Sequence, residues 1–423
     1  MKKSFLYFTF LINQIVFCQS NNFIHTSSKY ILGPCNDTLT LRGVNYAPYN
    51  WGYNSNDLKI DQIAMSGANS VRIVWYQNNP DQSTLYDNLV YLDSVLSKCI
   101  QYKLIPVIEL HDFTCQNNVA NLSQSSSFWT NPDLVTILNK YKHSLILNIA
   151  NEALYVNWSG NFISALNTYK TTYQNIITSL RNVVGFGFPI MIDAPDCGQT
   201  SDVFIASNTA QSLIDFDPEH NLIFSAHAYW YGYANNDSTQ MATKIDNVLA
   251  ANIPFVLGEI ANQQDDATMC QYDLNYQALL NHCQLRNVSW LAWSWDHDGC
   301  PQRQMSTNGN FNSLTTYGND IINNSNYGLS NGVLKSEYLE NNGCSTNSVE
   351  QVKFNEKFNI FPNPSETEIY VQNLISETSY EIININGKTV SKGLTDGLIS
   401  ISNLEKGVYY VLIKEYKFKL IKQ

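Results

Sequence analysis

The chain of 423 residues has little charge, and most of that charge is negative. Charged residues make up 14% of the sequence, and 25 Lys and Arg against 36 Asp and Glu give a formal net charge of −11. Setting aside +2 on residues 1–20 and +1 on residues 351–423 leaves −14 on residues 21–350. Such an excess repels phosphate backbones and argues against nucleic acid as a partner, whereas it does not affect binding of an uncharged sugar polymer.

Long apolar runs are also missing after the first 20 residues, so we expect no transmembrane segment. At the N-terminus two lysines precede an apolar stretch that Asn13 and Gln14 interrupt, which is the layout of a secretory signal peptide. We expect residues 1–19 to be removed, with cleavage near Cys18 or Gln19. Phe17 is too large for a lipoprotein box, so Cys18 is interpreted as discarded rather than lipidated.

Metal and nucleotide motifs are absent as well. No CxxC pair or Cys/His cluster has zinc spacing, and no GxGxxG follows an early apolar run. We therefore expect neither a metal nor a cofactor. Removal of Cys18 leaves an even number of cysteines, which in an exported protein predicts disulfides, but eight cysteines allow 105 pairings and the sequence does not choose among them. They are Cys35, Cys99, Cys115, Cys197, Cys270, Cys283, Cys300 and Cys344.

What the sequence does contain is a repeated alternation of short apolar runs with longer amphipathic stretches. The runs are continuous rather than alternating, as expected of parallel strands buried on both faces. Eight βα units predict an α/β fold of the closed (β/α)₈ TIM barrel type rather than an open sheet. The runs are Leu39 to Tyr46, Ser70 to Trp75, Ile105 to Leu110, Leu145 to Ala150, Pro189 to Asp193, Leu222 to His227, Pro254 to Glu259 and Ser289 to Trp295. The predicted helices are Asp57 to Met65, Leu85 to Gln101, Asp133 to Tyr141, Phe162 to Val184, Ala210 to Ile214, Met241 to Ala251 and Tyr272 to Leu285.

The sequence pattern changes near the C-terminus. Residues 341–353 are polar and unpatterned, which is typical of a linker. Residues 354–423 contain short β-rich runs separated by turn signals such as Asn386-Gly387, and they predict a small all-β sandwich domain. The barrel domain is thus expected to span residues 20–340.

Two glutamates directly follow predicted strands. Glu152 comes after the fourth run and Glu259 ends the seventh. The C-terminal ends of barrel strands form the active-site mouth, and retaining cleavage of a glycosidic bond needs two carboxyl groups about 5 Å apart. Either glutamate alone is equally compatible with an ordinary solvated or ion-paired loop acid. Together they predict Glu152 as acid/base and Glu259 as nucleophile.

Other strand ends supply residues of the types that this chemistry needs. Arg72 and Tyr229 are suited to keep a nucleophilic carboxylate ionised, and Asn151 is suited to bind a sugar 2-hydroxyl. The candidate substrate-binding residues are Arg72, His111, Asn151, His227, Tyr229, Trp293, Trp75, Trp230 and Trp295. Glu109 is expected to be an inward-facing supporting residue of the third strand, because its neighbour His111 better occupies the strand end, and Asp112 and Asp193 are further supporting candidates. Barrel filler remains the alternative for Trp293, and a hydrogen-bonded core role the alternative for the histidines.

At these residues the chain resembles glycoside hydrolase family 5. The matching pieces are RGVNY at Arg42, NSVRIVW at Asn69, VIELHD at Val107, LILNIANEA at Leu145, FSAHAYW at Phe224, PFVLGEI at Pro254 and WLAWSW at Trp290. The resemblance covers about 300 residues. It implies a TIM barrel and places Arg72, His111, Asn151, Glu152, His227, Tyr229, Glu259 and Trp293 on the family's active-site positions.

Within the family, NIANEA and LAWSW are most similar to bacterial endo-β-1,4-mannanases, because endoglucanases more often have Pro after the acid/base Glu and this chain has Ala153. The chain departs from the mannanase pattern after Trp295, where it reads Asp296-His297-Asp298-Gly299. We therefore expect cleavage of mannan or glucomannan. An endo-β-1,4-glucanase with the same mechanism is the alternative, and a non-catalytic polysaccharide-binding protein is a remote one.

The tail resembles the type A C-terminal sorting domain of Bacteroidetes proteins exported by type IX secretion. FPNP at Phe361, NGK at Asn386 and NLEKGVYY at Asn403 carry this resemblance. A carbohydrate-binding module is the alternative, but such a module usually offers aromatic platforms and residues 351–423 contain no Trp. We expect a monomer that is exported through periplasm and outer membrane with the help of the type IX machinery, and is then released or kept on the cell surface.

Overall fold

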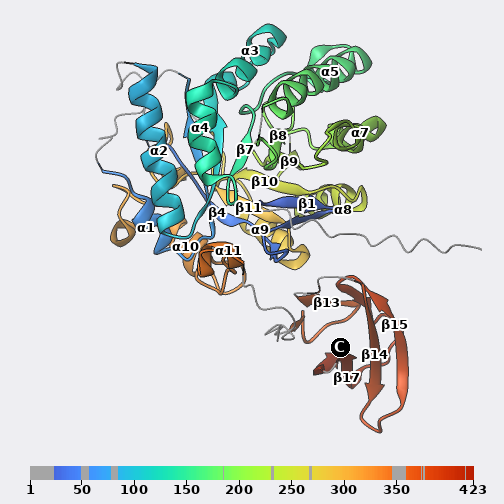
Figure 1. Ribbon diagram of the computed structural model, residues 1–423. Coiled ribbons are helices and arrows are strands. Elements are labelled where there is room, and N and C mark those ends of the chain that lie inside the picture. Colours follow the sequence, from blue (N-terminus) through green and yellow to red (C-terminus); the bar gives the residue numbers. More distant parts are fainter. Residues whose placement is uncertain are drawn as a thin grey trace, which may run out of the picture.

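The computed structural model describes residues 23–48, 57–77, 84–183, 185–229, 233–265, 269–344, 359–372, 374, 377–414 and 416–423. Within them, eight parallel strands close into a barrel in the order β10-β11-β4-β5-β6-β7-β8-β9 (Figure 1). Each strand matches one predicted apolar run, which confirms the predicted α/β barrel. The barrel strands are β4 (Arg42–Tyr46), β5 (Ser70–Trp75), β6 (Ile105–Leu110), β7 (Ile146–Asn148), β8 (Ile190–Asp193), β9 (Leu222–His227), β10 (Phe255–Ile260) and β11 (Ser289–Ala292).

Helices surround the barrel strands (Figure 1). All seven predicted helices are present, with shorter or shifted ends: α1 (Ile60–Ala64), α2 (Leu85–Gln101), α4 (Pro132–Tyr141), α5 (Phe162–Arg181), α7 (Thr209–Phe216), α8 (Ser238–Ala250) and α9 (Tyr276–Arg286). Side chains fix several helix starts; Thr84, for example, accepts a hydrogen bond from the backbone N–H of Asp87 at the start of α2. The sequence did not predict α3 (Val119–Trp129), α6 (Asp202–Ile205), α10 (Thr316–Asn323) and α11 (Glu337–Asn341).

The bottom of the barrel is apolar and is closed by the N-terminal segment. Inward-facing residues of five strands pack against a small antiparallel sheet made of β1 (His25–Ser27), β2 (Tyr30–Leu32) and β3 (Thr38–Leu39). This cluster contains Ile24, Ile31, Leu39, Leu41, Ile105, Val107, Ile146, Met191, Ile223, Val256 and Leu339. Among the described residues, the lower end is therefore filled and covered, and the barrel is open at the opposite end, where the strands terminate.

Six of the eight expected cysteines form disulfides. The pairs are Cys35–Cys344, Cys115–Cys197 and Cys270–Cys300. The first joins the turn after β2 to the residue that ends the described barrel domain. Cys99 and Cys283 are instead free thiols. They lie on the buried faces of α2 and α9, where they pack in the core as small apolar side chains.

The tail forms two antiparallel sheets of orders β12-β13-β16 and β15-β14-β17-β18. Alternate residues of both sheets point into one apolar cluster, which includes Ile369, Val371, Ile382, Val411 and Leu420. Two sheets that share one core make a β-sandwich, as predicted. The strands are β12 (Asn359–Phe361), β13 (Glu368–Gln372), β14 (Thr378–Asn384), β15 (Thr389–Thr395), β16 (Leu398–Ser400), β17 (Gly407–Ile413) and β18 (Tyr416–Lys422).

The proposed signal peptide and most of the proposed linker lie outside the described residues. Among the residues that are described, no helix combines the length and the apolar character that a membrane span requires.

Candidate active site

Arg72 lies at the centre of the open end of the barrel. It points inward from β5 and its side chain is fully buried. Its guanidinium donates hydrogen bonds to Glu259 Oε1 at 2.8 Å, Asn151 Oδ1 at 2.7 Å and Asn45 Oδ1 at 3.0 Å. It also contacts Asp193 Oδ2 at 3.2 Å. One cation therefore joins the ends of several strands and fixes where the polar side chains at the mouth point.

Glu259 is directed into the site by an irregularity in β10. The pairing register of β10 with β9 shifts between Leu257 and Glu259, so Glu259 lies opposite His227. A β-bulge of this kind re-aims a side chain that simple alternation would send elsewhere. Gly258 permits this arrangement, because a Cβ at its position would come within 2.4 Å of Ser225 Oγ and 3.0 Å of His227 Nε2.

Glu152 reaches the same place from the end of β7. Its backbone has φ of 52°, a left-handed conformation that is uncommon for a non-glycine residue. Its backbone N–H donates to Asp193 Oδ2 at 3.3 Å. The side chain forms a 2.7 Å hydrogen bond between Oε1 and His227 Nδ1. The same His227 Nδ1 lies 3.5 Å from Glu259 Oε1.

The two carboxyl groups are therefore close neighbours. One oxygen of Glu152, one of Glu259 and a ring nitrogen of His227 all lie within 4.8 Å of one another. Retaining glycosidases have carboxyl groups about 5–5.5 Å apart, whereas inverting enzymes need about 6.5–9.5 Å to accommodate a water molecule. The observed spacing is of the retaining type. The same three groups could also approach a metal ion, but the contact of Glu259 with Arg72 and the contacts of both glutamates with His227 suit a site for proton transfer.

Burial and neighbouring charges affect the pKa values of Glu152 and Glu259 differently. Burial raises the pKa of Glu152 well above its usual value, and the nearby charges of Glu259 and Asp193 raise it further. Burial also raises the pKa of Glu259, to about 7, but Arg72 in direct contact and His111 oppose that rise. Burial lowers the pKa of His227, so its ring is neutral between them. We therefore expect Glu259 to ionise first and Glu152 to retain its proton.

The raised pKa of Glu152 predicts a pH-dependent change in stability. Above about pH 4.5 the Glu152 side chain of the unfolded chain loses its proton, whereas that of the folded protein keeps it. The free energy of unfolding therefore falls as the pH rises from about 4.5 towards the pKa of Glu152 in the folded protein. Glu152→Gln removes this cost. We expect the Tm of the barrel in this variant to exceed that of the wild type increasingly from pH 4.5 to pH 8, by about 2–4 °C for each kcal/mol.

Differential scanning calorimetry at several pH values measures this difference. Glu219→Gln, at an exposed position, is the control and should leave the Tm unchanged at every pH. A constant offset between Glu152→Gln and wild type across the range would contradict the raised pKa.

The structure brings most of the predicted partners to this mouth. Asn151 donates to Thr114 Oγ1 at 3.0 Å and accepts from Arg72. His111 is held by Glu109 Oε1 at 2.8 Å, a contact that the sequence did not specify. Trp293 stacks on His111, with ring centroids 5.8 Å apart and an interplanar angle of 15°. Tyr229 hydrogen-bonds Glu259 and thereby favours its ionised form.

Both supporting acids take part in the loop structure. Asp193 is fully buried and contacts Arg72, Asn148 and the backbone of Glu152. Asp112 accepts a hydrogen bond from the backbone N–H of Gln77 at 3.0 Å, so it ties together the loops after β5 and β6.

Two of the predicted aromatic contacts are wrong. Trp75 is on β5 at an odd distance from Arg72, so it points away from the barrel interior, where it is fully buried and contacts Tyr91 of α2. Trp295 is also fully buried, and its indole N–H donates to the carbonyl of Gly309 at 2.8 Å. Neither has a face that a sugar can reach. Trp230 lies outside the described residues.

The sequence did not predict the assembly of loops beside Glu152. The Cys115–Cys197 disulfide joins the loops after β6 and β8, and Cys115 Sγ lies 3.4 Å from Glu152 Oε2. Asp196 accepts three backbone N–H groups from residues 156–158 of the intervening loop, at 2.9, 3.0 and 3.1 Å. This assembly presents Trp158, which is 54% exposed. In the sequence, the only indication that Trp158 lies near the mouth was its position six residues after Glu152.

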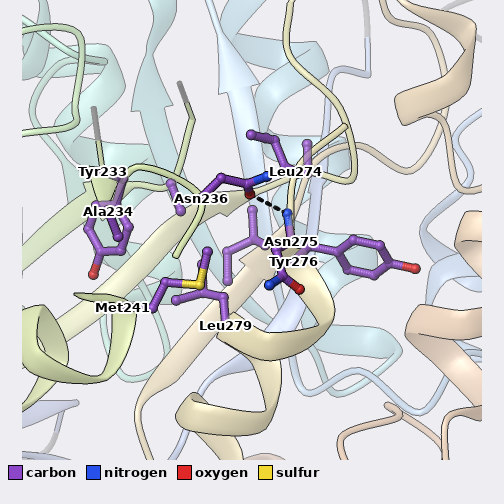
Figure 2. A pocket seen from close by; sticks show the side chains of 11 residues that line it. Tyr233, Ala234, Asn236, Met241, Leu274, Asn275, Tyr276 and Leu279 are labelled. Carbon is purple, nitrogen blue, oxygen red and sulfur yellow. Dashed lines mark hydrogen bonds between the residues drawn. The ribbon is translucent and has the colours of Figure 1, made fainter. Parts of the chain in front are cut away.

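A small cavity elsewhere does not compete with the mouth as a substrate site. It lies between β10, α8 and α9, has an internal volume of about 10 Å³ and is lined by Met241, Leu274 and Leu279 among others (Figure 2). Such a volume holds no more than about one water molecule, far less than a sugar ring.

Known proteins resemble this chain in both sequence and fold. A family model described as cellulase (glycosyl hydrolase family 5) matches residues 33–299, and one described as a secretion system C-terminal sorting domain matches residues 359–423. A mannan endo-1,4-beta-mannosidase from Cellvibrio japonicus (strain Ueda107) is 30% identical over 332 residues, which cover 77% of this chain and 71% of that protein. One from Salipaludibacillus agaradhaerens is 26% identical over 286 residues, covering 67% and 85%. The catalytic domain of a mannanase from Streptomyces sp. SirexAA-E shares the barrel fold, with a TM-score of 0.62 at 22% identity over 78% of this chain and 99% of that one.

Proposed function

Because the chain belongs to glycosyl hydrolase family 5 and is therefore a glycoside hydrolase, we propose that it is a retaining endo-hydrolase of β-1,4-mannan. In this proposal Glu152 is the acid/base and Glu259 is the nucleophile. The observation that carries it is the approach of both carboxyl groups to one another within 4.8 Å around His227, at the only open end of the barrel among the described residues.

The reaction proceeds in two displacements at the anomeric carbon. In the first, a Glu259 oxygen attacks the anomeric carbon while the glycosidic oxygen leaves and takes the proton of Glu152. In the second, water attacks the same carbon, gives its proton to the Glu152 carboxylate, and Glu259 leaves as a carboxylate. Arg72, at 2.8 Å from Glu259, stabilises that carboxylate at the start and again at the end.

The surrounding residues position the sugar. His111 and Trp293 form a stacked pair at the mouth that provides a flat surface for a pyranose ring. Asn151 is oriented by Arg72 and Thr114, so its amide is fixed where the 2-hydroxyl of the reacting sugar is expected. The proposal assigns substrate contacts to these residues together with His227 and Tyr229.

Mannan is supported by the relatives from Cellvibrio japonicus, Salipaludibacillus agaradhaerens and Streptomyces lividans, all three of which are mannan endo-1,4-beta-mannosidases. The alternative is a β-1,4-glucan, because the matching family model is described as cellulase. We expect reducing-sugar release from mannan and glucomannan to exceed that from carboxymethylcellulose by at least about 10²-fold in kcat/KM, because a site that hydrogen-bonds the axial 2-hydroxyl of mannose leaves polar groups unpaired when glucose is bound. Activity on carboxymethylcellulose alone would replace mannan by cellulose.

For the tail, we propose export by type IX secretion, with residues 354–423 as the sorting domain, residues 341–353 as the linker and residues 20–340 as the catalytic domain. The match of residues 359–423 to a secretion system C-terminal sorting domain supports this. Release or surface attachment would follow export.

A further inference from the structure

The loop after β11 contains a carboxylate that four donors share. Asp298 Oδ1 accepts the backbone N–H of Cys300 at 2.6 Å and Nε of Arg303 at 2.9 Å. Its Oδ2 accepts the Arg303 terminal nitrogen at 2.7 Å and the indole N–H of Trp293 at 2.5 Å. The Asp298 side chain is 2% exposed. A buried carboxylate with this many donors is held in one orientation.

Arg303 links Asp298 to the proposed nucleophile Glu259 through Tyr229. Its guanidinium carbon lies 5.4 Å from the centre of the Tyr229 ring, within the range of a cation–π contact. Tyr229 in turn hydrogen-bonds Glu259. Burial opposes the charge of Arg303, but the negative charges of Asp298 and Glu259 raise its pKa, so the arginine and the proposed nucleophile interact electrostatically.

The loop itself is tightly fixed. The Cys270–Cys300 disulfide joins it to the loop after β10, the strand that carries Glu259. The backbone N–H of Ser294 donates to the carbonyl of Arg303 at 3.0 Å. Asp298 and Arg303 thus sit on a rigid support, as a positioning device requires. Asp298 also belongs to the segment in which this chain departs from the mannanase pattern, Asp296-His297-Asp298-Gly299, and Arg303 follows that segment.

We propose that Asp298 and Arg303 form a positioning pair that holds Trp293 and Tyr229 in place and adjusts the charge balance of Glu259. This inference rests on the proposed role of Glu259 as nucleophile. Arg303 favours the carboxylate form of Glu259, whereas Asp298 offsets that effect, because the two residues carry opposite charges at the same side of the site.

The pair acts within a larger set of charges. Among the described residues, the titratable and charged groups around the nucleophile come from six elements or their C-terminal loops. They are Arg72 on β5, Glu109 on β6, His111 on the following turn, Glu152 after β7, Asp193 on β8, His227 and Tyr229 on and after β9, and Asp298 and Arg303 after β11. Each member of the pair can therefore be changed while the other charges stay in place.

The acid limb of the pH profile of kcat/KM reports the ionisation of Glu259. Single substitutions of Arg303 and Asp298 should move this limb in opposite directions. Arg303→Gln removes the cation and leaves Asp298, so the limb shifts to higher pH. Asp298→Asn leaves Arg303 unopposed, so the limb shifts to lower pH. We expect each shift to be about 1 pH unit, the order expected for one charge several ångströms away at an effective dielectric constant of about 20. In the double variant the acid limb should lie close to its wild-type position. Arg303→Lys keeps the positive charge, so its acid limb should also lie near the wild-type position.

A matched control uses the second buried bidentate pair. Arg181 contacts Asp217 at 2.7 and 2.8 Å at the lower end of the barrel. Asp217→Asn, or Asp246→Asn at the exposed Arg286 pair if the first does not fold, should lower stability without moving the limb. Shifts of the Asp298 and Arg303 variants in one direction, or no shift in either, would overturn the proposal.

A second measurement does not depend on mannan hydrolysis. Carbon-13 NMR titration of labelled glutamate in Glu152→Gln protein, with the Glu259 signal assigned from Glu259→Gln, reports ionisation of Glu259 directly. Opposite displacements of this titration by the two substitutions are expected. Absence of mannan cleavage by the wild type with these displacements present would refute the proposed substrate and leave the pair intact, whereas equal titrations in all variants would refute the pair.

Discussion

Replacing Glu259 by alanine is expected to lower kcat on mannan by about 10⁴- to 10⁶-fold, the range seen when a catalytic nucleophile is removed. The carboxylate supplies the bond that replaces the glycosidic bond in the first displacement, and no other described carboxylate takes the same contact with Arg72 at 2.8 Å. Asp193 also contacts Arg72, but its second oxygen is held by Asn148 inside the barrel.

Rescue of Glu259→Ala by an added nucleophile shows whether Glu259 acts as the nucleophile, because the anomer of the product reveals the side of attack. Azide added to Glu259→Ala protein should attack the anomeric carbon from the vacated side and release an α-glycosyl azide from an activated β-glycoside. NMR of the product establishes the anomer. Glu219→Gln serves as a surface control with unchanged rate. A Glu259→Ala protein that retains more than about a hundredth of the wild-type activity would refute the assignment of Glu259 as nucleophile.

Glu152→Gln is expected to produce a loss that depends on the leaving group. General acid catalysis contributes about 10²- to 10⁴-fold, and this whole factor should be lost in kcat/KM on mannan, because a sugar alkoxide cannot leave without a proton. An aryl β-mannoside with an acidic phenol needs no proton to leave, so its first displacement should be nearly unaffected.

With such an aryl substrate, the second displacement still needs a base, so the glycosyl-enzyme should accumulate and give a burst of phenol equal to the enzyme concentration. Stopped-flow absorbance and intact-protein mass spectrometry detect the burst and the adduct. The wild type is the control and should show no burst at the same pH. Equal losses on mannan and on the activated substrate would contradict the acid/base role of Glu152.

The barrel could be predicted because each strand is buried on both faces. Runs such as Ile105–Leu110 and Leu222–His227 are continuously apolar, and few other structures produce eight of them with helices between. The helix α3 was missed because VANLSQSSSFW is mostly polar, with Leu122, Ser125, Phe128 and Trp129 as its buried positions. Its existence depends on tertiary contacts with its neighbours rather than on its own pattern.

The proximity of Glu152 and Glu259 could be predicted because strand ends fix their location, and side-chain alternation was enough to exclude one wrong candidate. Arg72 and Trp75 are three residues apart on one strand, so they cannot both face the interior. The bulge at Gly258, the left-handed Glu152 and the Asp196 contacts could not be predicted, because each depends on residues far apart in sequence. The disulfide pairing was open for the same reason.

The Cys35–Cys344 disulfide has a consequence for how the enzyme can be held. It lies at the covered end of the barrel, where β2, β3 and α11 pack, and it fixes the point from which the chain continues towards the tail. A force applied through the C-terminal domain would therefore act on the covered end of the barrel. If the proposed function holds, an attachment at that end would not obstruct a polysaccharide bound at the opposite, open end.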